Sequence, residues 1–339
     1  MTHGVAARQR RFYTMITDGE ERSPMDALSI LHHCARRLRL DQVGTVALPL
    51  SAQLTEILSQ EHAPCPFTPQ DIHARTQPER LLPNARSVIV VLFPYRTERG
   101  IDPAANLSRY TWSRDYHLIC RQYLDRLGAR LAAYLPDDVF LPFVDTSPLP
   151  DRYLAYAAGL GFFGRHRSLI NPRYGTYVTI GGLITTHPFP AATVDSRSCY
   201  ACNRCLTACP GNALTPTDFD YTRCKSYLTQ KKGDLSPEEI AILRKNPLVF
   251  GCDTCQDVCP HNEEAALSPL PEFAQDQLRR IDADTLTAHS NRTFRDAYGD
   301  RAWAWRGKGV LLRNHRYLQE GDDPVIHPPG TDDPTSCPT

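Results

Sequence analysis

Eight of the chain's 12 cysteines lie between Cys199 and Cys259, whereas the other four are scattered. The first residues of the chain are basic but have no apolar stretch behind them, so we expect no secretion signal and therefore reduced thiols. In a reducing compartment, clustered cysteines indicate metal binding or catalysis rather than disulfides. We therefore expect residues 199–259 to fold around bound metal.

The first cysteine run has the spacing of bacterial ferredoxins. It reads Cys199-x2-Cys202-x2-Cys205-x3-Cys209 and is followed by Pro210. In two-cluster ferredoxins with this spacing, the first three thiolates bind one [4Fe–4S] cluster and the fourth binds the other cluster. The run therefore predicts two clusters rather than one.

The second cysteine run has the same ending but no leading cysteine. It reads Cys252-x2-Cys255-x3-Cys259-Pro260, and Val249 stands where a further cysteine would fall. Crossed ligation leaves one ligand missing, and Cys224 is the one unassigned cysteine of the segment. The predicted ligands are Cys199, Cys202, Cys205 and Cys259 for one cluster, and Cys209, Cys224, Cys252 and Cys255 for the other.

The alternative for such cysteine pairs is structural zinc, because two CxxC pairs also occur in zinc ribbons. Two Cys-Pro endings after a three-residue spacer are typical of iron–sulfur proteins instead. We therefore expect [4Fe–4S] clusters.

Before the cysteines, the apolar pattern predicts an α/β domain. Residues 87–93 form a nearly continuous apolar run, which is typical of a strand buried on both faces. Such strands alternate with amphipathic helices along the chain. We expect helices at 27–40, 116–134 and 151–158, strands at 43–50, 87–93, 139–144 and 177–185, and a loop region at 60–85.

The composition divides the chain into four parts. We expect an α/β domain over residues 1–188, a ferredoxin-like domain with two [4Fe–4S] clusters over 189–265, and a short helical C-terminal region over 266–320. Within this last region, residues 308–319 are predicted to form a basic helix. Residues 321–339 are rich in Pro, Asp and Thr and are expected to be disordered.

The charge and hydropathy exclude some classes of protein. Lys and Arg together number 38, as do Asp and Glu, so the net charge is zero. No apolar run reaches the roughly 18 residues of a membrane span. We therefore expect a cytoplasmic protein without a membrane segment.

One glycine motif matches the dinucleotide-binding fingerprint only by its letters. Gly159-x-Gly161-x-x-Gly164 follows a helical stretch, whereas the fingerprint must follow a strand, and no acidic ribose ligand stands at the right distance. The motif predicts either a turn in which backbones pack closely or, as we prefer, close approach to a large cofactor.

Taken together, these motifs resemble the epoxyqueuosine reductase family, which is related in its cofactors to reductive dehalogenases. The resemblance covers roughly residues 85–320. The residues that carry it, besides the cysteines and the glycine motif, are Arg114-Asp115-Tyr116-His117, Asp145-Thr146-x-Pro148, Arg223-Cys224-x-Ser226-Tyr227-Leu228-Thr229 and Gly251-Cys252-Asp253-x-Cys255-Gln256.

The resemblance implies an α/β cobalamin-binding domain followed by a ferredoxin-like double [4Fe–4S] domain and a short C-terminal helical segment. It implies reductive removal of the epoxide oxygen of epoxyqueuosine in tRNA, with Asp145 as the proton donor. A carboxyl beside an apolar cofactor face would have a raised pKa, which suits a donor. The alternative for Asp145 is the N-cap of the helix that begins at Asp151, since Asp is a preferred cap.

Other site residues are predicted around this aspartate. His117 is expected to support catalysis from the N-terminus of the 116–134 helix. The remaining residues are expected to contact the cofactor, namely Asp115, Tyr116, Gly159, Gly161, Gly164, Ser226, Tyr227 and Asp253.

Three functions are open at this point. The first is reduction of epoxyqueuosine in tRNA; the second is reduction of a small molecule, such as an organohalide, by a related corrinoid enzyme; the third is electron transfer without a substrate. An electron donor such as ferredoxin or flavodoxin is expected for an enzyme. A tRNA substrate needs a basic surface, and the candidates are Lys225, Lys231, Lys232, Arg301, Arg306, Lys308, Arg313 and Arg316.

Overall fold

A four-stranded sheet lies at the centre of the N-terminal half of the protein. The computed structural model describes residues 25–59 and 65–319. The strand order is β1-β2-β6-β3, and every neighbouring pair is antiparallel. The strands are β1 (Val43–Ala47), β2 (Ser87–Pro94), β3 (Phe140–Val144) and β6 (Val178–Thr185).

Helices cover both faces of this sheet, which explains the continuous apolar run of β2. All eight residues of β2 are buried. Ile89, Val91 and Phe93 point to one face, and the alternate residues of the strand join the apolar cluster on the other face. Continuous apolar runs such as this one are common in parallel sheets, whose strands are buried on both faces. Here the run forms a central antiparallel strand, because helices cover both faces of the sheet.

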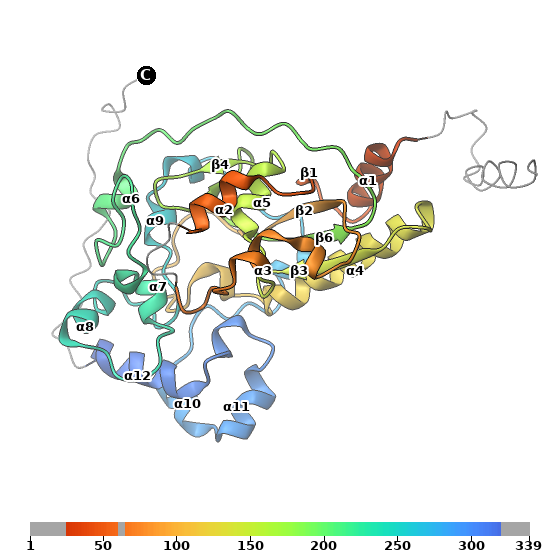
Figure 1. The fold of residues 1–339 in the computed structure, drawn as a ribbon. Helices are drawn as coiled ribbons and strands as arrows, with labels where there is room; N and C mark the ends of the chain where they lie inside the picture. The colour runs from red at the N-terminus through yellow and green to blue at the C-terminus, as the bar shows by residue number, and fades with distance from the viewer. Residues whose placement is uncertain (1–24, 60–64, 320–339) are drawn as a thin grey trace, which may run out of the picture.

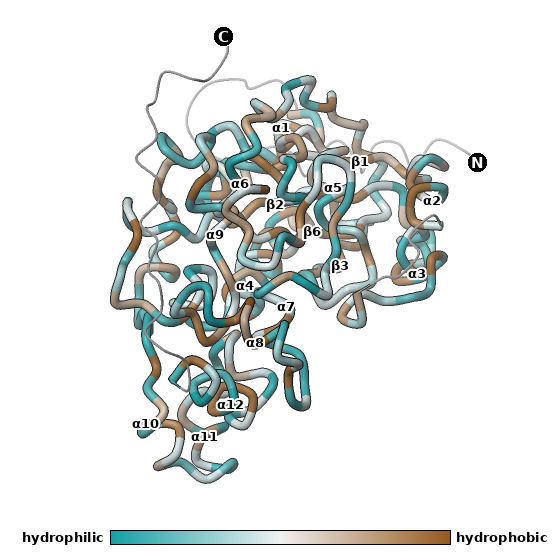
Figure 2. Tube along the Cα trace, turned by 90° about the vertical axis from the view of Figure 1, so that its left-hand side faces the viewer, coloured by the Kyte–Doolittle hydropathy of each residue, from teal (hydrophilic) through white to brown (hydrophobic). Residues whose placement is uncertain are grey.

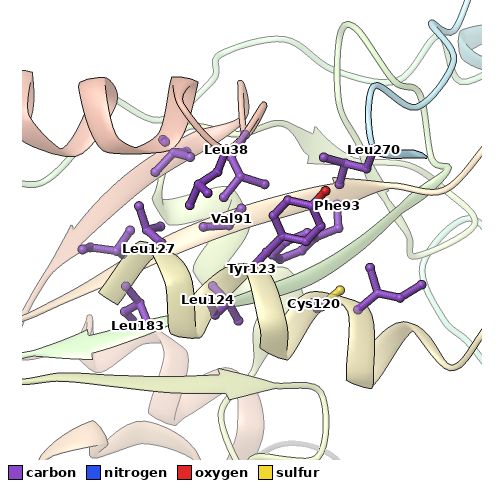
Figure 3. Close-up of a cluster of buried hydrophobic side chains, with 14 of the residues drawn as sticks. Leu38, Val91, Phe93, Cys120, Tyr123, Leu124, Leu127, Leu183 and Leu270 are labelled. Carbon is purple, nitrogen blue, oxygen red and sulfur yellow. The ribbon is translucent and has the colours of Figure 1, made fainter. Parts of the chain in front are cut away.

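The first face packs against α1 (Ala27–Arg36) and α4 (Tyr116–Tyr134). Apolar residues of α4 recur at helical spacing, so that one stripe of the helix meets the sheet. Figure 3 shows Cys120, Tyr123, Leu124 and Leu127 of α4 pointing towards this core. The opposite face packs against α5 (Asp151–Ala157).

The predicted elements of this half agree with the structure apart from their ends. The helix at 116–134 matches α4, whereas the first helix ends at Arg36 rather than at 40 and the first strand ends at Ala47 rather than at 50. The expected loop region at 60–85 was wrong in part, because α3 (Ile72–Thr76) lies in it. Asp71 accepts hydrogen bonds from the first backbone N–H groups of α3, which starts the helix. Another short helix, α2 (Ala52–Ser59), precedes the segment.

An extended segment leads from the sheet to the cysteines. It follows β6, and its Pro190 carbonyl accepts a hydrogen bond from Thr45 Oγ1 of β1 at 2.6 Å. In Figure 1 this green segment runs along the top of the molecule from near α1 to α6. A small hairpin lies nearby, formed by β4 (Phe162–Phe163) and β5 (Leu169–Ile170).

The cysteine-rich segment is built from short helices. These are α6 (Arg204–Thr207), α7 (Lys225–Leu228), α8 (Pro237–Leu243) and α9 (Thr254–Asp257). Single 3₁₀ turns occur along the chain at Pro78–Arg80, Arg109–Thr111, Tyr221–Arg223, Pro260–Asn262, Pro271–Phe273 and Ala302–Ala304.

Three helices form the C-terminal part of the described chain: α10 (Ala283–Ala288), α11 (Asn291–Tyr298) and α12 (Lys308–Gln319). The predicted basic helix matches α12, and the other two helices were not foreseen. Figure 2 shows these helices at the opposite end of the molecule from the sheet. Their apolar core includes Leu107 and Trp112 from the segment that follows β2, so the N-terminal half reaches into the C-terminal part.

Two expectations lie outside the described residues, namely the lack of an N-terminal secretion signal and the disordered tail at 321–339. No helix within residues 25–59 and 65–319 is long and apolar enough to cross a membrane.

Candidate functional site

Four of the predicted ligands surround one cavity. Its wall contains Cys199, Cys202, Cys205 and Cys259, so the end of the second run meets the start of the first. Helices α6 and α9, which carry Cys205 and Cys255, pack against each other and bring the two runs together. This grouping is the crossed arrangement expected from the spacing.

The other four cysteines also lie together. The thiols of Cys252, Cys224 and Cys209 are close enough to Cys255 for their charges to act on it, and Cys205 is near as well. The two groups are thus neighbours, with Cys205 and Cys255 on the facing sides.

Burial sets the chemistry of these thiols. It raises the pKa of Cys259 to about 12 and that of Cys224 to about 11. Buried thiols ionise only when a nearby cation compensates the charge, as iron does. Among the described residues, no group of three or more His, Cys, Asp or Glu side chains is placed to hold a single metal ion.

A second site lies at the C-terminal end of β3, where Asp145 accepts hydrogen bonds from two residues of α4. Tyr116 donates its hydroxyl to Asp145 Oδ2, and His117 Nε2 is hydrogen-bonded to Asp145 Oδ1. His117 Nδ1 in turn lies 2.6 Å from Oδ1 of Asp115. Asp115 also caps α4 by accepting from the backbone N–H of His117, so the helix start holds the imidazole in place.

The N-cap expectation for Asp145 was wrong. Helix α5 has Pro150 as its N-cap, without a side-chain capping bond. The Asp145 carboxylate is instead directed to α4, and 39 % of its side chain is exposed. Its exposed part is free to meet a substrate.

The His117 imidazole is held between two carboxylates. Burial alone would lower its pKa, but the hydrogen bonds and charges of Asp115 and Asp145 outweigh burial and raise the pKa of His117 to about 10. His117 is therefore an imidazolium at neutral pH, with both ring nitrogens donating.

Sequence reasoning missed Asp151 as part of this cluster. Burial, and next the charge of Asp145, raise the pKa of Asp151 to about 7. In the sequence, Asp151 was recognisable only as the first residue of a predicted helix. Its proximity to Asp145 depends on the path of the loop between β3 and α5.

A chain of contacts links Asp145 to the second cysteine group. The rings of Tyr116 and Tyr110 meet edge to face, with centroids 6.0 Å apart. A Cβ built on Gly251 would lie 3.3 Å from the Tyr110 ring, and the next residue is Cys252. Tyr110 was not predicted, yet it is the residue that connects the acid to the cysteines.

Two family models match the chain. One is described as a 4Fe-4S double cluster binding domain and matches residues 198–262, and the other as epoxyqueuosine reductase, matching residues 75–146. The epoxyqueuosine reductase of Bacillus cereus is 35% identical over 83% of this chain and 76% of its own length. That of Staphylococcus aureus is 34% identical over the same shares.

The chain belongs to the epoxyqueuosine reductase family. The match to the double-cluster domain also decides for two [4Fe–4S] clusters over the zinc alternative. Two solved structures of family members have the same fold. One holds an epoxyqueuosine-modified tRNA-Tyr stem loop (TM-score 0.76, 29% identity, 86% of this chain and 81% of that chain). The other, from Bacillus subtilis, has its catalytic aspartate loop swung out of the active site (TM-score 0.76, 28% identity, 86% and 82%).

Within this family fold, the glycine motif serves chain packing. Gly159 has a φ of +70°, and a Cβ there would lie 2.3 Å from the Thr193 carbonyl oxygen. At Gly161 the Ile170 carbonyl is equally close, and at Gly164 the His166 ring occupies the space. Close packing within the protein therefore accounts for these glycines, and the cofactor contact that we preferred stays a prediction. Helix α5 precedes the motif, in agreement with rejecting the dinucleotide fingerprint.

Three other predicted cofactor contacts have partners within the protein. The buried Asp253 carboxylate accepts from the Ser108 hydroxyl and, at 2.7 Å, from the Arg109 backbone N–H, so it holds the turn that carries Tyr110. The backbone N–H groups of Ser226 and Tyr227 bond to the Cys224 thiol. The Tyr227 ring packs against Phe67, with centroids 5.2 Å apart.

Proposed function

We propose that this protein reduces epoxyqueuosine to queuosine in tRNA. The observation that carries the proposal is the contact chain from Gly251, the residue before Cys252, through Tyr110 and Tyr116 to Asp145. It brings an electron source and a proton source to one place. Deoxygenation of an epoxide needs both, because two electrons and two protons convert the epoxide into an alkene and water.

We assign the cluster ligands by the two groups described above. Cys199, Cys202, Cys205 and Cys259 would bind one cluster, and Cys209, Cys224, Cys252 and Cys255 would bind the other. The exposed Tyr200 ring beside the first group makes that cluster the entry point for a ferredoxin or flavodoxin. Electrons would then pass to the second group, which lies nearer to Asp145.

Cobalamin is the cofactor that this family resemblance implies. When bound, it supplies a cobalt centre that can act on the epoxide carbon. Within this chain, Asp145 and Tyr110 would border it, since burial and the carboxylates of Asp253, Asp145 and Asp115 together raise the Tyr110 pKa and so mark their closeness. Tyr110 is thus kept as a neutral phenol.

Asp145 would pass a proton to the departing oxygen. Tyr116 orients its carboxylate through Oδ2, and burial together with Asp145 keeps the Tyr116 hydroxyl protonated by raising its pKa. The proton would come from the His117 imidazolium, through the hydrogen bond between Nε2 and Asp145, as the oxygen leaves, and solvent would then reprotonate His117. The remaining contact, from His117 Nδ1 to Asp115, fixes the ring orientation.

A tRNA substrate requires a protein surface that contacts phosphate and base. Several of the predicted basic residues serve the fold instead. Lys225 is 1% exposed and donates to the carbonyls of Leu243 and Asn246, both at 2.6 Å. Arg313 is likewise buried and donates to the Leu228 carbonyl at 3.0 Å.

Arg306 is the basic residue best suited to substrate. Its guanidinium stacks 3.8 Å from the Trp305 ring and 4.6 Å from the Phe67 ring. Trp305 is 54% exposed. Exposed aromatic rings with an arginine are typical of surfaces that bind single-stranded nucleic acid, such as an anticodon loop.

The small-molecule and electron-transfer functions are less well supported. Electron transfer alone would need no acid network. A tRNA substrate also places the protein in the cytoplasm.

The test is nucleoside analysis of tRNA. Deletion of the gene should cause epoxyqueuosine to accumulate, and the purified, anaerobically reconstituted protein should convert an epoxyqueuosine-modified stem loop. Unchanged queuosine in the deletion strain, together with no conversion in vitro, would reject tRNA as the substrate.

A further inference from the structure

His166 lies in the wall of the cavity that the first four cysteines share. It sits at the turn of the β4–β5 hairpin, in which Gly164 N–H donates to the Ser168 carbonyl at 3.0 Å. The side chain is buried, with 6% of the residue exposed. The hairpin therefore inserts one imidazole beside a predicted cluster from a part of the chain that contains no cysteine.

A hydrogen bond determines the tautomer of His166. The backbone N–H of Ser168 donates to His166 Nδ1 at 3.2 Å. Because Nδ1 accepts, it carries no proton, so the proton of the ring is on Nε2. Yet Nε2 is buried and has no hydrogen-bond partner among the described residues.

An unpaired N–H in such a place is unusual. Leaving a buried donor unpaired costs free energy of folding, and most buried polar groups in proteins are paired. A thiolate or sulfide of an iron–sulfur cluster is an acceptor for such a donor. The lack of a side chain at Gly164 leaves room for the His166 ring, because a Cβ there would lie 2.4 Å from His166 Cε1 and would displace the ring.

We propose that His166 Nε2–H donates a hydrogen bond to a sulfur of the cluster held by Cys199, Cys202, Cys205 and Cys259. The inference rests on the ligand assignment above. Reduction adds one electron to the cluster, and a donor aimed at its sulfur stabilises the added negative charge. His166 thereby makes this cluster easier to reduce, which favours acceptance of electrons from the external donor.

The experiment compares His166→Phe with the unaltered full-length protein after anaerobic reconstitution. In a potentiometric titration followed by EPR, one of the two midpoint potentials should become more negative. A tenfold loss in the one-electron reduction equilibrium corresponds to about 59 mV. His166→Gln, whose amide can donate, should recover part of this shift.

His315→Phe is the matched control. His315 is also a buried histidine whose Nε2 has no partner in the described part of the chain, but it lies in α12 beside Ile281. Its replacement should leave both midpoint potentials unchanged.

A measurement on the unaltered protein tests the hydrogen bond even if the variant loses its cluster. With ¹⁵N-labelled histidine, pulsed EPR of the reduced protein should detect a ¹⁵N coupling and an exchangeable proton. Absence of both, or an unchanged midpoint potential in an iron-replete His166→Phe protein, would overturn the role of His166. If the unaltered protein shows no tetranuclear signal at all, the ligand assignment itself is wrong.

Discussion

At the scale of single residues, the protonation of the acid site is decided by neighbours. His117 lies between two carboxylates, which hold it as an imidazolium, and Asp145 receives hydrogen bonds from both Tyr116 and His117. The same side chains on separate surfaces would titrate near their ordinary values. Two predictions follow from this arrangement.

Asp145→Asn should retain iron and corrinoid but lose turnover by about 100-fold or more, because positioned proton donors contribute on the order of 10²–10⁴. Single-turnover conversion of an epoxyqueuosine stem loop, with iron content measured in parallel, tests this. The matched control is Asp138→Asn at the other end of β3, where Asp138 Oδ2 lies 2.8 Å from His187 Nδ1. Full activity of Asp145→Asn would show that another group donates the proton.

His117 should contribute to stability in a pH-dependent manner. Its folded pKa of about 10 lies above the ordinary value of 6.5, so its stabilising contribution is complete below pH 6.5 and is lost as the pH rises towards 10. The difference in melting temperature between the unaltered protein and His117→Gln should therefore be largest at pH 6 and shrink towards pH 10. A constant difference across this range would contradict the imidazolium assignment.

At the scale of elements, α12 connects the C-terminal helices to the cysteine-rich segment. Asn314 is completely buried and donates to the carbonyls of Thr229 and Val249, both at 2.8 Å. Thr229 ends α7 and Val249 lies just before Cys252. The Asn314 side-chain amide thus fixes α12 against the two segments that carry the predicted cluster ligands Cys224 and Cys252.

Asn314→Leu should destabilise the protein by about 2 kcal/mol, since it leaves two buried carbonyls without their donor. Urea unfolding of the reconstituted protein measures this. Gln319→Leu, at the exposed end of the same helix, should change stability little. Equal effects of the two substitutions would mean that the Asn314 contacts do not hold α12 in place.

At the scale of the whole molecule, a neutral chain can still bind tRNA through a local surface. The net charge is zero, and several basic residues are used within the fold. The surface that we propose for a nucleic acid is one where three distant segments meet, at Phe67, Tyr227 and Trp305. Such a surface exists only once the chain is folded.

Arg306→Gln should weaken binding of an anticodon stem loop and reduce the slope of log K against log[salt] by about 0.7–0.9, the contribution of one phosphate contact. Fluorescence anisotropy at several salt concentrations measures both. The control is Arg280→Gln, an exposed arginine that pairs with Asp282 at 2.9 Å. An unchanged slope in Arg306→Gln would place the phosphate contacts elsewhere.

Local patterns in the sequence were sufficient for much of this protein. Cysteine spacing predicted which four thiols share a cavity, because two-cluster ferredoxins with this spacing have crossed ligation. Helical periodicity predicted α4 to the residue, since this helix buries one apolar stripe. The basic helix predicted at 308–319 matches α12. The family motif located Asp145.

Only the tertiary structure decided how these parts meet. The antiparallel pairing of β2, the contact of Tyr110 with Gly251, and the placement of His166 beside cysteines some 33 or more positions away along the chain all join distant segments. The sequence determined which residues can ionise, bind metal or form helices, because these depend on neighbours along the chain. The structure determined which of them share a proton or a cavity, because that depends on how helices and loops pack against a common sheet.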